Sequence, residues 1–439
     1  MEAVWPTKKL RDLADIHISN VDKKAHASET PVKLCNYMDV YSNEYITSEI
    51  QFMDASASIA EIERFSLNYG DVIITKDSET PDDIGIPTVV VEKIDDLVCG
   101  YHLALIRPNP DELDPIYLAK QLSTSQVARY FAMQASGSTR YGLPISAIEA
   151  VEIPTPPKSE QTKIAEILST VDRAIEQIEA LIAKQQRIKT GLMQDLLTRG
   201  IDEHGNLRSE QTHRFKDSSL GRIPVEWEVK KLIEIAGYQN GKAFPSSDYG
   251  ISGVRLVRPG NLASNGLVMW DAKHTTYLPD PYWPRSLEYQ VGAGEILMNL
   301  TAQSLEDQFL GRVCITPSCN ECLLNQRIAR IMPHSCERDF LYWALKGPQF
   351  REYIDSIPQG TKVQHIYNRN LDAIRLAIPE CPTEQLSIAD TLWGVENKNH
   401  ILLQHLEKLR FLKTALMQDL LTGKKRVAVL LKEMEDANK

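Results

Sequence analysis

Two loops of similar composition carry side chains suited to a polyanionic ligand. The first is Gly137-Ser-Thr-Arg-Tyr141 and the second is Gly360-Thr-Lys-Val-Gln-His365. Glycine lets a backbone approach a ligand closely, and hydroxyl, arginine and lysine groups bind phosphate oxygens. The candidate contacts are Ser138, Thr139, Arg140, Tyr141, Thr361, Lys362, Gln364 and His365, of which the last two could also reach nucleic-acid base edges. The other interpretation is an ordinary polar turn that precedes a helix.

A second group of polar residues follows the first expected strands of each half. These residues are Asn36, Tyr37 and Asp39 in the first half and Arg255, Arg258 and Asn261 in the second, with Lys76 at the end of the strand over 70–75. Amide, hydroxyl and guanidinium groups are common in contacts to bases and phosphates. Plain solvation of surface loops explains the same composition equally well, so both interpretations stay open.

The catalytic signatures that we sought do not occur in the sequence. The segment from Gly237 to Lys242 has one spacer residue too few for a P-loop, and Ala243 replaces the hydroxyl group that would hold magnesium. Asp280-Pro-Tyr282 lacks the second proline of the amino-methyltransferase motif, and the ten histidines form no metal-ligand cluster. We therefore expect a non-catalytic chain without a cofactor of its own.

A group of cysteines in the second half raises the alternative of a zinc site. Cys319 and Cys322 have the spacing of a ligand pair, and Cys314 and Cys336 stand nearby. The matching stretch of the first half, near 94–97, has no cysteine and still predicts a strand connection. We therefore favour a turn without metal. Seven cysteines in total fit free thiols in a reducing cytoplasm better than a disulfide framework.

An internal repeat organises the chain. The segment Leu192-Met-Gln-Asp-Leu-Leu-Thr198 recurs as Leu416-Met-Gln-Asp-Leu-Leu-Thr422, an offset of 224 residues (416 − 192). The same offset relates Glu160-Gln161 to Glu384-Gln385, and a weaker likeness extends over the rest of each half. Chance similarity between leucine-rich helices is the alternative, but the shared register argues against it. The order is therefore globular part, helix, globular part, helix.

Both repeated segments predict long helices that pair along an apolar seam. Their apolar residues alternate in steps of four and three, as in a coiled coil. We expect the seam to contain Ile164, Leu168, Val171, Ile175, Ile178, Ile182 and Leu192 in the first helix and Ile388, Leu392, Val395, Leu402, Leu406, Leu409 and Leu416 in the second, continued by Ile188, Leu196, Leu412 and Leu420. The pattern permits parallel or antiparallel pairing, or helices that pack only on their own globular parts. We expect an antiparallel coiled coil.

The rest of each half predicts a mixed fold with short strands. Apolar runs bounded by turn residues predict strands over 70–75, 88–92, 102–107, 295–299, 311–315 and 327–331, and helices over 115–133 and 340–354. The fold class is therefore α/β (α+β), with two globular domains separated by two long helices in a pseudo-twofold internal repeat. We place the domains at 1–155 and 215–378, the helices at 156–200 and 379–423, a linker at 201–214 and a tail at 424–439.

The charge balance opposes a nucleic-acid ligand. The net charge is -10 and the sequence pI is about 5.6, whereas phosphate binding usually shows as a basic excess. The chain has no stretch of ~20 apolar residues, as a membrane helix needs, and no secretory signal follows Met1. These features predict a cytoplasmic protein without a membrane partner.

The order of parts and three short segments resemble the specificity subunit of type I restriction–modification systems. The segments are Leu220-Gly-Arg-Ile-Pro-Val-Glu-Trp227, Ile153-Pro-Thr-Pro-Pro157 with Glu160-Gln161, and Leu192-Met-Gln-Asp-Leu-Leu-Thr198. No single segment is diagnostic, but the arrangement is specific and covers nearly the whole chain. One departure is Trp5-Pro6, which stands where the second half has a longer lead-in.

The resemblance implies a role inside a larger complex. Each globular domain would be a target recognition domain that reads one half of a bipartite site in double-stranded DNA, and the helices would set the gap. Two modification subunits would dock on the helices and carry S-adenosylmethionine-dependent adenine methylation. Restriction subunits, which use ATP and Mg, would join that core. These partners would supply much of the positive DNA channel, which would reconcile the acidic charge with DNA binding.

A second function class fits the acidic composition better. In that alternative the chain is a coiled-coil scaffold that joins two protein-binding modules and contacts no nucleic acid. Co-purification with a methyltransferase, and a split adenine-methylated motif in host DNA, would distinguish the two functions.

Overall fold

Two helices of 39 residues each form the longest elements of this computed structural model, which describes residues 5–303, 308–318, 321–357 and 363–428. Helix α6 spans Lys158–Leu196 and helix α12 spans Pro382–Leu420. Each begins at or directly after proline, and each is followed by a glycine with positive φ, Gly200 or Gly423. Proline at the start and glycine beyond the end are common boundaries of helices, and both helices are a few residues shorter than the predicted 156–200 and 379–423.

The chain divides into two units, and each long helix contributes one half to either unit. Unit 1 comprises Met1–Glu179 and Gln404–Lys439, and unit 2 comprises Ala180–Leu403. The first half of α6 therefore lies in unit 1 with the second half of α12. The remaining halves lie in unit 2.

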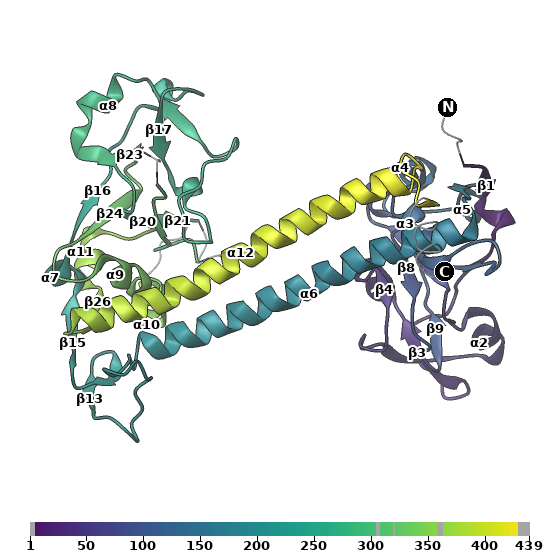
Figure 1. Cartoon of the computed structure of the whole chain (residues 1–439), viewed down its shortest axis with the longest axis horizontal. Helices are drawn as coiled ribbons and strands as arrows, with labels where there is room; N and C mark the ends of the chain where they lie inside the picture. Colours follow the sequence, from purple (N-terminus) through teal and green to yellow (C-terminus); the bar gives the residue numbers. More distant parts are fainter. Residues whose placement is uncertain (1–4, 304–307, 319–320, 358–362, 429–439) are drawn as a thin grey trace, which may run out of the picture. The chain divides into compact units, whose positions relative to one another are not determined.

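Unit 1 is built on two sheets (Figure 1). In spatial order, the larger sheet contains β2 (Ala14–Ile18), β10 (Leu103–Pro108), β6 (Val72–Thr75), β8 (Pro87–Val90) and β4 (Tyr45–Ile46). The smaller sheet contains β5 (Met53–Ala57), β3 (Thr30–Cys35) and β9 (Leu97–Cys99). Neighbouring strands are antiparallel except β4 with β8 and β3 with β9. The three strands predicted in this half are confirmed.

Unit 2 repeats this topology. Its larger sheet contains β16 (Ala236–Asn240), β24 (Ile328–Pro333), β20 (Ile296–Asn299) and β22 (Val313–Ile315), and its smaller sheet contains β18 (Thr276–Leu278), β17 (Val254–Val257), β23 (Cys322–Leu324) and β19 (Gln290–Val291). The parallel pair β17–β23 corresponds to β3–β9, and a parallel bridge between Leu267 and Ile315 stands where unit 1 has β4 beside β8. The sequence repeat is therefore a repeat of fold.

Shorter elements complete both units. Unit 1 has β1 (Thr7–Lys9) paired with β12 (Glu152–Pro154), and helices α2 (Ile59–Phe65) and α5 (Ile145–Glu149). Unit 2 has β15 (Trp227–Lys231) paired with β26 (Arg375–Pro379), the hairpin β13 (Phe215–Ser218)–β14 (Gly221–Pro224), and helices α7 (Leu232–Ile235), α8 (Tyr282–Arg285) and α11 (Asn368–Ala373). The β1–β12 and β15–β26 ribbons are equivalent, which extends the repeat to the edges of the units.

The helices predicted over 115–133 and 340–354 are each broken in two. The first is α3 (Pro115–Leu122) followed by α4 (Ser125–Gln134), and the second is α9 (Arg338–Ala344) followed by α10 (Pro348–Ser356). Thr124 caps α4 by accepting a hydrogen bond from the Val127 backbone N–H at 3.4 Å, and Pro348 starts α10 because it has no N–H to donate. The single long helices of the prediction are wrong for this reason.

The main core of each unit joins the larger sheet, the short helix pair and the long helices. In unit 1 this core includes Ile164, Leu168 and Leu420, and in unit 2 it includes Ile388 and Leu392. The beginning of each long helix therefore packs on a globular part as well as on the other helix. Neither long helix has the apolar stretch that would span a bilayer, and the same holds for the other helices in the described ranges.

Candidate nucleic-acid interface

Residues that are far apart in the sequence meet at one edge of unit 1. Strand β7 (Asp77–Ser78) directly follows Lys76 and pairs antiparallel with β11 (Tyr141–Gly142), which closes the loop over 137–141. Helix α1 (Tyr37–Ser42) begins beside this ribbon, and Tyr37 and Arg140 line the same surface hollows. The structure thus brings together both groups of candidate residues in the first half, the loop over 137–141 and the residues after the first strands.

Two adjoining hollows of about 700 and 770 Å³ mark this edge of unit 1. Both are lined by Tyr37, Met38 and Arg140. The first continues over Asp22, Lys23, Lys24, Asn36, Asp39, Tyr101 and His102, and the second over Tyr41, Asp77, Ser78, Glu79, Thr80, Asp83 and Thr139. Ser138, Thr139 and Arg140 are exposed, so their side chains are available to a ligand on this surface.

Gly137 gives the loop its shape. Its φ is +149°, and a Cβ atom there would lie 2.0 Å from the Arg140 carbonyl oxygen. Ser136 and Gly142 exchange backbone hydrogen bonds of 3.1 and 2.9 Å across the ends of the loop. Because only glycine fits this close approach, the loop presents its hydroxyl and guanidinium groups from a fixed turn.

Two of the predicted contact residues in unit 1 have structural partners. The Asp39 carboxylate accepts a hydrogen bond from the Asn36 backbone N–H at 2.7 Å and so caps α1, and burial raises the pKa of Asp39. Lys76 Nζ donates to Asp77 Oδ1 at 2.7 Å, and only 19% of the Lys76 side chain is exposed. Asp39 and Lys76 therefore shape the site more than they extend from it.

The second candidate site has the same framework in unit 2. Strand β21 (Thr301–Ala302) pairs with β25 (Gln364–His365) as β7 pairs with β11, and Gln364 and His365 are half-buried there. The His365 ring lies edge-on to Tyr367, with 4.6 Å between centroids. Burial, and then the nearby charge of Arg327, lower the pKa of His365. Thr361 and Lys362 lie outside the described residues.

The residues that follow β17 in unit 2 correspond to those that follow β3 in unit 1. The Arg258 backbone N–H donates to Asn261 Oδ1 at 2.9 Å, as the Asn36 N–H donates to Asp39. Asn261 is fully buried, and its Nδ2 also donates to the Met269 carbonyl at 3.1 Å. The predicted DNA contact of Asn261 is therefore wrong, because this side chain holds the loop together from inside.

The two arginines of this group are placed differently from Asn261. Arg258 is exposed, its Nη1 donates to Thr276 Oγ1 at 3.0 Å, and its guanidinium lies 5.3 Å from the Tyr249 ring centroid. Arg255 is half-buried, with its guanidinium 5.3 Å from the ring centroid of Trp270. Both cations are thus held on aromatic faces in the part of unit 2 around β17.

Twelve residues that line the hollows of unit 1 were not predicted as contacts, and four of them are acidic: Asp22, Asp77, Glu79 and Asp83. Four others could bind a ligand directly. Lys23 and Lys24 add positive charge, and Tyr101 and His102 form a ring pair with 3.9 Å between centroids. His102 also has a φ of +73°, which is uncommon for a residue other than glycine. The charge of the two lysines was visible in the sequence, but nothing in the local pattern signals the backbone conformation of His102.

Two of the cysteines behind the zinc alternative lie inside strands. Cys314 and Cys322 are buried in β22 and β23, and burial raises the pKa of each thiol to about 12. Cys319 lies outside the described residues. In the part of the chain that is described, no three His, Cys, Asp or Glu side chains are placed to hold a metal ion.

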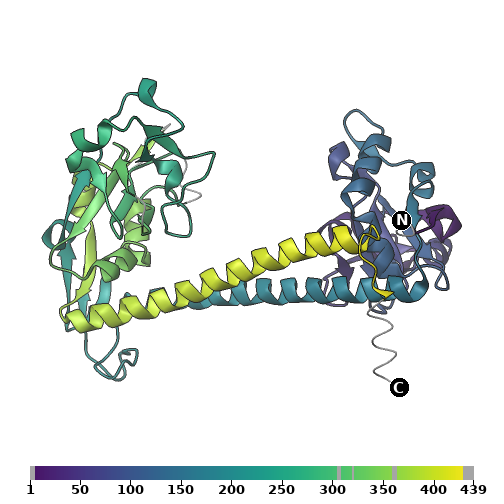
Figure 2. The same ribbon diagram turned by 45° about the horizontal axis from the view of Figure 1, so that its top comes forward.

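The long helices pair antiparallel within each unit, as both views show (Figure 1 and Figure 2). In unit 1, Arg410 Nη2 donates to Glu179 Oε1 at 2.6 Å, and in unit 2, Asn399 Nδ2 donates to Gln186 Oε1 at 3.2 Å. All fourteen predicted seam residues are buried or half-buried.

The continuation of the seam through Ile188 and Leu412 is wrong. Their side chains are 39% and 45% exposed, whereas the polar residues Gln185 and Asn399 are buried. The strict heptad rule fails here because an α-helix drifts by ~20° per heptad relative to that rule.

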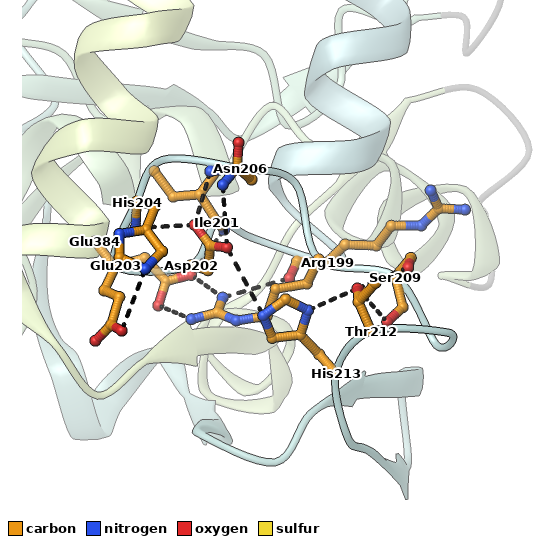
Figure 3. Close-up of polar contacts among 11 residues, drawn as sticks. Arg199, Ile201, Asp202, Glu203, His204, Asn206, Ser209, Thr212, His213 and Glu384 are labelled. Carbon is orange, nitrogen blue, oxygen red and sulfur yellow. Dashed lines mark hydrogen bonds and ion pairs between the residues drawn. The ribbon is translucent and has the colours of Figure 1, made fainter.

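A buried ion pair fixes the start of α12 in unit 2. Arg208 Nη2 donates to Glu384 Oε2 at 3.0 Å, and Trp227 Nε1 donates to Glu384 Oε1 at 3.1 Å. Figure 3 shows the turn beside Glu384, in which the Asp202 carboxylate accepts backbone hydrogen bonds, including one of 2.8 Å from Asn206. The segment predicted to be a plain linker is therefore an ordered support for the helix.

Unit 1 has an equivalent support from the residues after α12. Arg426 makes a bidentate contact with Glu160, with distances of 2.9 Å from Nε and 2.8 Å from Nη2. Its guanidinium also lies 5.4 Å from the Trp5 ring centroid. Each unit thus clamps the first turn of one long helix with an arginine that follows the other.

Comparisons with known proteins agree with this architecture. The family model described as "Type I restriction modification DNA specificity domain" matches residues 3–187 and 224–410. The chain is 29% identical over 318 residues to the type I restriction enzyme MjaVIII specificity subunit of Methanocaldococcus jannaschii, covering 72% of this chain and 71% of the relative. It is 24% identical over 432 residues to the putative MjaX specificity subunit of the same organism, covering 96% and 94%.

A solved structure shares the fold. The crystal structure of the type I restriction–modification S subunit from M. genitalium superposes with a TM-score of 0.61 at 16% identity, over 96% of this chain and 97% of that chain. At this identity the likeness bears on the fold alone. The fold of this chain, in which a globular part and a long helix occur twice, is thus shared with a solved structure.

Proposed function

Because the chain belongs to the family of type I restriction–modification DNA specificity proteins, we propose that each of its recognition domains reads one half of a bipartite site in double-stranded DNA. The observation that carries this proposal is a pair of equivalent edges with different side chains. The β7–β11 edge of unit 1 presents hydroxyl groups beside Arg140, a candidate phosphate contact, whereas the β21–β25 edge of unit 2 presents Gln364 and His365. One scaffold with two polar surfaces suits the reading of two unlike sequences.

The acidic charge is concentrated in the first globular domain. The argument from net charge against DNA binding therefore applies mainly to that domain. Residues 1–155 contain 13 basic and 24 acidic residues, a net charge of −11, whereas residues 215–378 contain 18 and 17, a net charge of +1. We therefore expect the second domain to contribute more of the phosphate contacts. Around the first domain, partner subunits would supply the missing positive charge.

The long helices support the proposal that modification subunits dock on them. Several large apolar side chains on these helices are exposed: Leu181, Ile188, Leu386, Ile401, Leu403, Phe411 and Leu412. The Phe411 side chain is 79% exposed, and contact of this large apolar group with water is unfavourable unless a partner covers it. Phe411→Asp should therefore abolish co-purification with the modification subunit, while Lys398→Asp, a change of the same kind at an exposed polar residue of α12, should not.

The chemistry in this proposal belongs to the partners. Adenine methylation would use S-adenosylmethionine bound by the modification subunits, and DNA translocation and cleavage would use ATP and Mg bound by the restriction subunits. This chain would act in the cytoplasm without catalysing a step. Its contribution is to place the methyltransferase on one DNA sequence.

An exchange of domains tests the proposed function. Replacing residues 1–155 with the recognition domain of another family member should change one half of the methylated motif in host DNA and leave the other half and the spacer unchanged. Sequencing of methylated adenines across the genome reads all three features at once. A host genome without a split motif that depends on this chain would favour the scaffold function instead.

A further inference from the structure

His102 and Arg327 occupy equivalent positions in the two units. His102 directly precedes β10, and its carbonyl accepts a hydrogen bond of 2.8 Å from the Lys76 N–H. Arg327 directly precedes β24, and its carbonyl accepts a hydrogen bond of 2.9 Å from the Leu300 N–H. Lys76 follows β6 and Leu300 follows the equivalent β20. The two side chains therefore extend from equivalent backbone positions, directly before equivalent strands of the two larger sheets.

Both side chains stand beside the ribbon at the candidate interface. His102 Nδ1 lies 2.6 Å from Asp77 Oδ2 on β7, and His102 lines the same hollow as Arg140. Arg327 is exposed. Burial is the main cause that lowers the pKa of His365 on β25, and the positive charge of Arg327 lowers it further, so the two side chains are near each other. The side chain at this position thus lies near the β7–β11 ribbon in unit 1 and near the β21–β25 ribbon in unit 2.

The backbone at His102 is held in an unfavourable conformation. Its φ of +73° costs of the order of 1–3 kcal/mol for a residue with a side chain. The Tyr101 ring packs against the imidazole, and the Asp77 carboxylate holds Nδ1. A strained residue fixed on two sides presents its remaining ring nitrogen, Nε2, in one direction.

We propose that His102 and Arg327 are equivalent base-reading residues, each of which selects one base pair in the half-site read by its own unit. This inference rests on the proposed function in DNA recognition and goes beyond it by assigning the position that differs. An arginine presents a fork of N–H donors that matches N7 and O6 of guanine in the major groove. A histidine held at Nδ1 presents the single atom Nε2 and cannot make that bidentate contact.

The difference between these two side chains predicts different bases at equivalent positions. Among the described residues, the Arg327 guanidinium has no hydrogen-bond or ion-pair partner, so its donors are available to a base. Unit 2 should therefore require guanine at one position of its half-site. Unit 1 should not require guanine at the equivalent position.

Substitution of Arg327 tests the assignment in the intact complex. Cells that carry the complex with Arg327→Gln should methylate sites in which one base pair of one half-site is relaxed, with about 5- to 100-fold less preference for guanine there. The other half-site and the spacer should be unchanged, which also shows that the variant folds. Arg375→Gln, which removes an exposed arginine on β26, is the matched control and should keep the full motif.

A second pair of variants keeps the result decisive if Arg327→Gln abolishes methylation. Arg327→Lys keeps the charge without the fork, so it should restore methylation with the same base relaxed. His102→Arg should introduce a preference for guanine in the half-site of unit 1, whereas Gln51→Arg, which adds the same charge away from both hollows, should not.

Three results would overturn the proposal: an unchanged motif in Arg327→Gln and His102→Arg, full restoration of the original motif by Arg327→Lys, or relaxation spread over both half-sites. A genome without any bipartite motif in the unmodified strain would instead refute the proposed function. The two failures are therefore distinguishable.

Discussion

Lys413 on α12 and Asp172 on α6 form a largely buried ion pair in unit 1, with 2.8 Å between Nζ and Oδ1. The same contact recurs in unit 2, where Lys189 Nζ lies 2.6 Å from Glu396 Oε2. Both members of the second pair follow from the first at the repeat offset of 224 residues, with the two helices exchanged (172 to 396, 189 to 413). The repeat therefore includes the contacts that fix the pairing of the long helices.

Loss of the Asp172 charge should destabilise unit 1. Asp172 contacts Lys120 at 2.5 Å as well as Lys413, and burial raises the pKa of Asp172 while these two lysines hold it below its ordinary value. Asp172→Asn leaves two largely buried ammonium groups with less compensation, so we expect a loss of roughly 3 kcal/mol in the free energy of unfolding. Chemical denaturation measures it.

The control for this variant is the exposed pair between the same helices. Arg410 and Glu179 have side chains that are 61% and 45% exposed, and solvent screens their attraction. Glu179→Gln should cost less than ~1 kcal/mol. An equal loss in both variants would show that the burial of Asp172 does not matter.

Gly200 should be irreplaceable because of the clamp around Glu384. Its φ is +63°, and a Cβ atom would lie 2.2 Å from Glu384 Oε1 and 2.4 Å from Trp227 Cζ2. We expect Gly200→Ala to lose roughly 3 kcal/mol, as backbone strain and overpacking add. Gly205→Ala has a similar φ of +81° but open space around it, so only strain of about 1 kcal/mol applies. Thermal unfolding of the two variants separates these terms.

Lys346 should make the stability of unit 2 depend on pH in the alkaline range. Burial, and then the charge of Lys189, lower the pKa of Lys346 to about 8, whereas an unfolded lysine titrates near ~10.4. Between these two pKa values the lysine is protonated in the unfolded chain but neutral in the folded chain. The free energy of unfolding should therefore fall as the pH decreases from ~10.4 to about 8 and stay level below that.

Lys346→Met removes this buried charge and should flatten the profile. We expect a gain in the free energy of unfolding on the order of 2 kcal/mol at neutral pH, with little gain at pH values near ~10.4. Lys273→Met, which removes an exposed lysine of the same unit, should leave the profile as it is. Unfolding curves across this pH range provide the measurement, and a pH-independent gain would count against the titration of Lys346.

Arg140 should contribute to DNA binding through phosphate rather than sequence. In the assembled complex, Arg140→Ala should weaken binding to all sequences alike and reduce the salt slope by about 1. Lys93→Ala, at an exposed position outside both hollows, should have no such effect. The purified chain alone should bind DNA weakly at any sequence, and tight specific binding by it would contradict the assignment of the positive channel to the partners.

The helical part of the fold was predictable because its signal is periodic and repeated. Fourteen seam residues and the helix ends follow from spacing, proline and glycine, but Ile188 and Leu412 show where a strict heptad rule fails. The break before α4 was not predictable from apolar spacing, since it depends on a single cap at Thr124. Capping and helix drift act locally and leave little trace in a hydrophobic pattern.

The candidate interface was predictable in part. Glycine and basic residues identified the loop with Arg140, whereas Asn261 has the same polar character but serves as a buried cap. His102 and Arg327 follow no motif, because what unites them is the hydrogen bond of their carbonyls to equivalent strand ends. Such an equivalence becomes visible only when two strands that are distant in sequence are paired.

We propose that the paired helices set the distance between the two half-sites. Matched insertions of seven residues after Glu179 in α6 and after Leu403 in α12 keep the seam in phase and lengthen the paired segment by ~10 Å. Methylated adenines mapped across the host genome should then define a motif with both half-sites unchanged and a spacer longer by up to about three base pairs. An unchanged spacer, or altered half-sites, would show that the helices do not set this distance.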